Sequence, residues 1–241
     1  MVDFKKEEFK DEFIVFKDKT IKNLNKTIEN KINEDYKKSV LLTYWIKDYN
    51  NFLKKEETYK PNFQPELQQG SIIQINLGFR LGNEQGGLHY AIVLDKKDNK
   101  RKSILTVVPL SSIKSNKKLL KTHVNLGSEV YNLINLKTEE IIKSAKNHIE
   151  EIDKLLNDSS YDRKEFFDLM SKSKLKIKYA EECNNKSKKL KKGSYAICEQ
   201  IVTISKMRVY DPITTEAPLY NLKISEESLQ KIRNVIIENY I

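Results

Sequence analysis

The chain has 241 residues, of which 39% are hydrophobic and 32% charged, and its formal net charge is +10. This length suits one large domain or a domain with an added module. Two cysteines exclude a disulfide framework or a cysteine metal cluster, and no apolar stretch reaches the roughly 18 residues that a membrane-spanning helix needs. The basic surplus leaves two interpretations open: attraction to nucleic acid, or a lysine-rich solvated surface.

Residues 3–57 predict two helices. The apolar residues of the first recur at the spacing of one helical face: Phe9, Phe13, Phe16, Leu24, Ile28 and Ile32. The stretch VLLTYWIKDYNNFL, residues 40–53, predicts the second, although no glycine or proline marks the break. We therefore expect a helical hairpin over residues 1–60 and a linker over 61–69, where Pro61 and Pro65 stop any helix. The first residues lack the apolar core of a signal peptide, which favours a cytoplasmic protein.

The rest of the chain predicts short strands interrupted by helices. Strand-like runs rich in β-branched residues occupy 71–79, 90–95, 103–110, 121–126 and 193–205. Between them, residues 135–158 predict a helix capped by Thr138, and 159–192 a second helix that fades into a basic loop over 184–193. A final helix follows its cap, Ser225. The simplest account is one β domain over 70–241, interrupted by a helical insertion at about 128–192.

One short stretch uses glycine in an unusual way. GNEQGGLHYAIVL, residues 82–94, holds three of the seven glycines within six residues, beside one of three histidines. Glycines let a loop backbone come close to a ligand, because they adopt positive φ and carry no Cβ. An ordinary hairpin loop is the other interpretation of the same pattern.

This stretch resembles the opening of the MazF/PemK toxins, small bacterial endoribonucleases of toxin–antitoxin pairs. Three further blocks resemble that family in order: LTVVPLSS, KTHVNL and KGSYAICEQIVTISKMRV. Together the four blocks cover residues 70–126 and 193–210. The N-terminal hairpin and the helical insertion have no counterpart in compact members of the family.

The resemblance implies an α+β fold: an SH3-like small β-barrel with a C-terminal helix, forming a homodimer. It also implies a toxin that cleaves single-stranded RNA at selected sequences without a metal or cofactor and is neutralised by a cognate antitoxin protein. No cofactor-binding motif is present. The resemblance assigns catalysis to His89 and Ser111, or to Ser112 in place of Ser111 if the register slips by one. It assigns RNA binding to Arg80, Asn83, Glu84, Gln85, Gly86, Gly87, Ser112 and Gln200.

His89 departs from the family pattern, which has an arginine at that position. Arginine supplies charge and paired hydrogen bonds to phosphate, whereas an imidazole ordinarily titrates near neutral pH and can transfer protons. We therefore expect His89 to act as a general acid or base and Ser111 to bond the scissile phosphate. Positive charge would then come from Arg80, Lys96 or Lys97. In the alternative interpretation, His89 is a packed residue at a strand edge.

Other candidates have structural interpretations. We expect His123 and His148 to be structural or exposed, and Glu199 to hold the glycine-rich loop or a dimer interface. The basic segment 184–193 is either a solvated linker or an arm that follows RNA phosphates. Two further functions remain open: a protein-binding module like the gyrase-poisoning toxins, and a built-in antitoxin formed by the N-terminal helices.

Overall fold

The computed structural model describes residues 3–114, 118–157 and 162–241, and the chain forms two compact units, Met1–Thr58 and Tyr59–Ile241. The first unit contains a short η1 (Glu7–Phe9) and two helices, α1 (Lys10–Glu34) and α2 (Tyr36–Glu56). Asp35 separates the helices, because its side chain accepts a hydrogen bond from Lys38 N at 3.1 Å and caps α2. This local cap explains a break that neither glycine nor proline marks. Helix α1 buries none of its residues.

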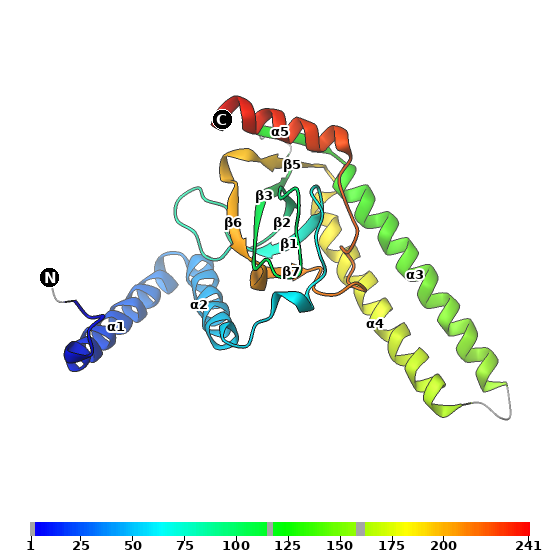
Figure 1. The fold of residues 1–241 in the computed structure, drawn as a ribbon, viewed down its shortest axis with the longest axis horizontal. Coiled ribbons are helices and arrows are strands. Elements are labelled where there is room, and N and C mark those ends of the chain that lie inside the picture. The colour runs from blue at the N-terminus through cyan, green and yellow to red at the C-terminus, as the bar shows by residue number, and fades with distance from the viewer. Residues whose placement is uncertain (1–2, 115–117, 158–161) are drawn as a thin grey trace. The chain divides into compact units, whose positions relative to one another are not determined.

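The second unit is built on an antiparallel sheet of seven strands (Figure 1). The strands are β1 (Ile72–Asn76), β2 (Leu88–Val93), β3 (Ile104–Ser112), β4 (His123–Gly127), β5 (Ser194–Ile197), β6 (Val202–Ser205) and β7 (Val209–Asp211). Their order is β4-β5-β3-β2-β1-β7, and β6 also pairs with β3. β4 and β7 lie at the two ends of this path, so the sheet is not closed. The fold is therefore α+β, and the expected SH3-like barrel is not confirmed.

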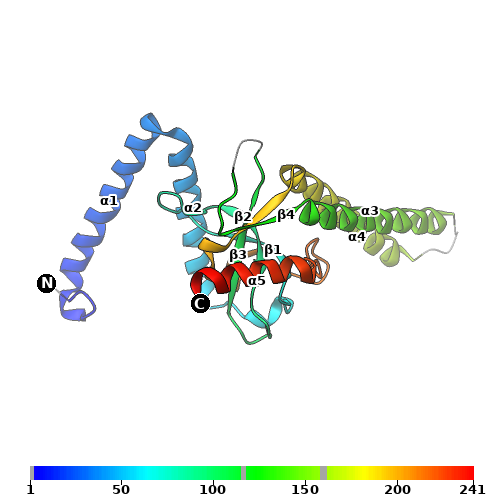
Figure 2. The same ribbon diagram turned by 90° about the horizontal axis from the view of Figure 1, so that it is seen from above.

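Two long helices connect β4 to β5. α3 (Glu129–Leu156) and α4 (Arg163–Ser187) lie side by side in both views (Figure 1, Figure 2). The prediction that Thr138 caps α3 is wrong, because the helix begins at Glu129 and the Thr138 hydroxyl donates to Ile134 O at 2.8 Å. The basic segment is not a loop either: α4 extends into it, and η3 (Lys188–Leu190) follows.

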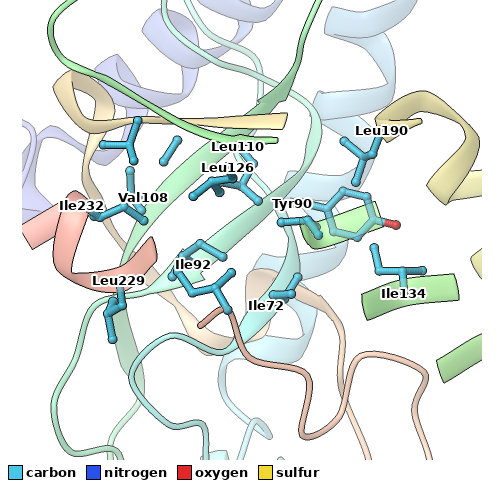
Figure 3. Packing of buried hydrophobic residues seen from close by; sticks show 14 of the residues in the cluster. Ile72, Tyr90, Ile92, Val108, Leu110, Leu126, Ile134, Leu190, Leu229 and Ile232 are labelled. Atoms are coloured by element: carbon cyan, nitrogen blue, oxygen red, sulfur yellow. The ribbon is translucent and has the colours of Figure 1, made fainter. Parts of the chain in front are cut away.

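Apolar side chains pack on both faces of the sheet. One cluster joins β2 and β3 to α3 and α5 (Glu226–Tyr240), and Figure 3 shows Leu229 and Ile232 of α5 on one side of it and Ile134 of α3 on the other. The second cluster joins β1, β2 and β3 to β6, β7 and Leu67 of the segment before β1. Ser225 caps α5 as predicted, since its hydroxyl accepts from Ser228 N at 3.2 Å. None of the helices in the described ranges is long and apolar enough to cross a membrane.

Candidate functional site

The glycine-rich stretch forms the loop between β1 and β2. Two backbone hydrogen bonds close its base: Leu77 N donates to Gly87 O at 2.8 Å, and Gly87 N donates to Gly78 O at 2.7 Å. A Cβ on Gly86 would lie only 2.8 Å from Gly78 O, and Gly87 adopts a φ of +79°. The glycines are thus needed for two backbone segments to meet closely.

Gln200 connects this loop to a distant part of the chain. Its Oε1 accepts from Gln85 N at 2.5 Å, and its Nε2 donates to Asn83 O at 3.0 Å. It belongs to η4 (Cys198–Gln200), a single turn that separates β5 from β6 where one continuous strand was predicted. The side chain that holds the loop is therefore that of Gln200, and the other expected place for Glu199, a dimer interface, stays a prediction.

A pocket of about 410 Å³ lies between this loop and η4. Its lining brings together five predicted RNA-binding residues: Arg80, Asn83, Glu84, Gln85 and Gln200. Leu77, Pro109, Glu199, Ile201 and Val202 complete the lining, whereas the other predicted site residues are not part of it. A larger cavity of about 980 Å³ is lined by the segment before β1 and by Lys96 and Lys97, which separates these two lysines from the loop. The smaller pocket is therefore the better candidate site.

His89 and Ser111 lie on the same face of the sheet beside this pocket. Ala91 of β2 pairs with Pro109 of β3, and residues two positions apart on a strand share a face. His89, two residues before Ala91, and Ser111, two residues after Pro109, therefore point to the side of Pro109, which lines the pocket. The structure brings the two predicted catalytic residues to neighbouring strands.

The imidazole of His89 contacts the backbone of β3. Its Nδ1 lies 3.2 Å from the carbonyl oxygen of Leu110, the residue before Ser111. A carbonyl oxygen only accepts, so a hydrogen bond here needs a proton on Nδ1, and Nε2 is the ring nitrogen left for another partner. His89 is half-buried.

Ser111 and Ser112 also belong to the ladder between β3 and β5. Ser111 pairs with Tyr195 and Ser112 with Ser194, so the sheet fixes the backbone of both serines. Both are half-buried.

His123 is part of a side-chain network that the sequence did not reveal. Its Nδ1 accepts from Leu120 N at 3.1 Å, its Nε2 lies 2.9 Å from Glu199 Oε1, and its ring lies 4.7 Å from that of Tyr195. Burial alone would raise the pKa of Glu199, but hydrogen bonds from Thr122, from its own backbone amide and from His123 outweigh it and lower that pKa. The side chain of His123 is 3% exposed, which agrees with its expected structural role.

The third histidine is remote from this site. His148 Nε2 on α3 lies 3.4 Å from the ammonium of Lys176 on α4. Within the described ranges, no group of three or more His, Cys, Asp or Glu residues lies close enough together to hold a metal ion.

A comparison with known protein families gives a match to the part of the chain that contains the glycine-rich loop. Residues 68–162 match the family described as PemK-like, MazF-like toxin of type II toxin-antitoxin system. A search of curated proteins found no match. The matched segment includes β1 to β4, the loop, His89 and Ser111, while Gln200 lies beyond it. The match confirms the predicted resemblance of this segment to the PemK-like, MazF-like toxins of type II toxin–antitoxin systems.

Proposed function

We propose that this protein is a sequence-selective, metal-independent endoribonuclease that cleaves single-stranded RNA. The observation that carries this proposal is the pocket lined by Arg80, Asn83, Gln85 and Gln200. Pro109 of β3 also lines this pocket, and His89 lies on β2, which pairs with β3. Cationic, amide and backbone groups suit the phosphates and base edges of an unpaired strand.

The proposed reaction is an attack of the ribose 2′-oxygen on the adjacent phosphorus. His89 Nε2 takes the proton of the 2′-hydroxyl as the O2′–P bond forms. The P–O5′ bond breaks, and the leaving 5′-oxygen takes a proton from solvent, which gives a 2′,3′-cyclic phosphate and a free 5′-hydroxyl. The Ser111 hydroxyl donates to a non-bridging phosphate oxygen. The hydrogen bond of Nδ1 to Leu110 O holds the ring in place during the proton transfer.

The match of residues 68–162 to a toxin family supports the proposed partners. We infer that a cognate antitoxin protein binds this chain and blocks its RNA site, and that the toxin acts in the cytoplasm as a homodimer. Gly86 and Gly87 then contribute to RNA binding through the shape of the loop, and Ser112 contributes from the end of β3.

Cleavage of an unstructured RNA in the presence of EDTA tests the proposal. Wild-type protein is expected to give discrete fragments with cyclic phosphate ends, and His89→Ala to abolish them. His148→Ala is the matched control, because it removes an imidazole from α3, which lines no part of the pocket. Intact RNA with the wild-type protein would contradict the nuclease proposal, and full activity in His89→Ala would remove His89 from the mechanism.

A protein-binding module is the second candidate. It is favoured by His89 itself, because the family pattern has an arginine at this position and arginine makes the paired phosphate contacts that histidine lacks. Stoichiometric capture of one protein from a cell lysate, combined with intact RNA, would favour this candidate. Fragmented RNA with no captured target would exclude it.

A further inference from the structure

Two arginines from distant parts of the chain are anchored at the same end of β1. Arg80 Nε donates to Leu77 O at 2.8 Å, and Arg208 Nε donates to Asn76 O at 2.8 Å. The two acceptors belong to consecutive residues. Both guanidinium groups are therefore held through Nε at this end of β1, although the two arginines are far apart in sequence.

This arrangement sets like charges beside one another. Burial is the main cause that lowers the pKa of Arg208, and the positive charge of Arg80 lowers it further. Both residues are half-buried. Arg80 has an ion pair with Glu84 at 3.9 Å, but the Glu84 side chain is 59% exposed, so solvent screens that attraction. A bound anion would stabilise such a pair of cations.

The sheet register places the pair close to His89. Ile75 of β1 pairs with Val209 on one side and with His89 on the other. Arg208 directly precedes Val209, and its anchor Asn76 directly follows Ile75. Strands lie about 4.8 Å apart, so Arg208 and His89 start from backbone positions on the order of 10 Å apart. Arg80 in turn lines the pocket.

We infer that Arg80 and Arg208 together bind one phosphodiester group of an RNA strand that passes His89. This inference rests on the proposed function and extends it, because it assigns the positive charge to a pair that includes a residue outside the glycine-rich loop. Two guanidinium groups can each direct their terminal N–H groups at one phosphate, which a single arginine cannot match. Lys96 and Lys97, which line the other cavity, are not needed.

Binding of a 2′-O-methyl RNA oligonucleotide tests this inference without cleavage, because the blocked 2′-oxygen cannot attack. Arg80→Gln and Arg208→Gln are each expected to weaken binding about tenfold and to reduce the dependence of log Kd on log salt by about one phosphate contact. The double variant is expected to lose less than the product of the single losses, since both arginines contact the same phosphate. Arg101→Gln, which removes one charge from the exposed turn before β3, is the control.

Several results would overturn the inference. They are an absence of binding by the wild type, losses in Arg80→Gln and Arg208→Gln no larger than in Arg101→Gln, and multiplicative losses in the double variant. If Arg208→Gln does not fold, Arg208→Lys keeps the charge, and its binding is expected to fall between those of the wild type and Arg80→Gln. Inorganic phosphate that competes as well as the oligonucleotide would mean a site for the free ion and not for RNA.

The two proposals can fail separately. If the protein cleaves RNA but the arginine variants bind the oligonucleotide normally, only the assignment of the arginine pair is wrong. If binding depends on both arginines but no RNA is cut, the pair is a nucleic-acid site and the nuclease proposal fails.

Discussion

The backbone N–H of Gln85 donates to Oε1 of Gln200 at 2.5 Å, and the amide of the same side chain donates back to Asn83 O. One glutamine thus spans three residues of the glycine-rich loop from a part of the chain more than a hundred residues away. The loop's shape depends on η4, so changes in either segment are expected to affect the other.

Gln200→Ala removes both of these hydrogen bonds. Each is worth about 1 kcal/mol net, and the loop is partly exposed, so we expect a loss of stability of about 1 to 2 kcal/mol together with faster hydrogen exchange at the Gln85 amide. NMR hydrogen exchange and urea unfolding measure the two effects. Gln230→Ala removes two exposed side-chain contacts on α5, to Asn234 and from Arg233, and serves as control. Unchanged protection of Gln85 would contradict the contact.

Gly86→Ala tests the close approach of the loop to Gly78. The new Cβ would lie 2.8 Å from Gly78 O and within 3.3 Å of the Arg80 side chain, so the backbone must shift. Such overpacking costs about 1 to 3 kcal/mol, and we expect RNA binding to weaken because Arg80 moves as well. Leu81→Ala, at an exposed position of the same loop, is expected to change stability little. Urea unfolding that does not distinguish the two variants would contradict this packing.

Substitutions at position 89 test the role of His89 in cleavage. Because Nδ1 contacts Leu110 O, Nε2 is the nitrogen that can take a proton from the 2′-hydroxyl. The single-turnover rate is therefore expected to fall steeply in His89→Gln, whose amide can still donate to Leu110 O but offers no base. His89→Arg is expected to lose the base as well, since arginine stays protonated. A single-turnover rate in His89→Gln equal to that of the wild type would leave His89 a positioning residue only.

Glu199 is expected to make the free energy of unfolding depend on pH. Its pKa is lowered in the folded protein from the usual value of about 4.5, because hydrogen bonds outweigh the effect of burial. As pH falls below about 4.5, the unfolded chain takes up the proton first, so the stabilisation present above that pH is lost through the folded-state pKa. Glu199→Gln is expected to reduce the slope of unfolding free energy between about pH 5 and 3, whereas Glu238→Gln, at an exposed site on α5, is not. Equal slopes in both variants would argue against the lowered pKa of Glu199.

A buried ion pair between Lys206 and Asp98 holds the turn between β6 and β7. Lys206 Nζ lies 2.6 Å from Asp98 Oδ1, and their side chains are 1% and 0% exposed. Lys206→Met leaves a buried carboxylate without its partner and is expected to cost about 3 to 5 kcal/mol in chemical unfolding. Lys206→Met combined with Asp98→Asn is expected to recover part of this loss, because the uncompensated charge is gone. A double variant less stable than the single one would contradict this explanation.

The sequence by itself determined the features that depend only on residues close together in the chain. Periodicity predicted the N-terminal helices, Ser225 predicted the start of α5, and the order of motifs predicted the toxin family that residues 68–162 match. A local signal gave a wrong prediction at Thr138. Threonine is a residue type that often caps helices, yet Thr138 lies inside α3, where its hydroxyl is bonded within the helix.

Only the tertiary structure decided how distant segments meet. The break at Cys198–Gln200 carries no proline or glycine, and Gln200 within it bonds a loop elsewhere in the sequence. The proximity of Arg80 and Arg208 likewise depends on β7 pairing with β1, and the His123–Glu199 contact depends on β4 pairing with β5. Hydrogen bonds between strands set these distances. The alternation of residues within one strand does not show which other strand pairs with it.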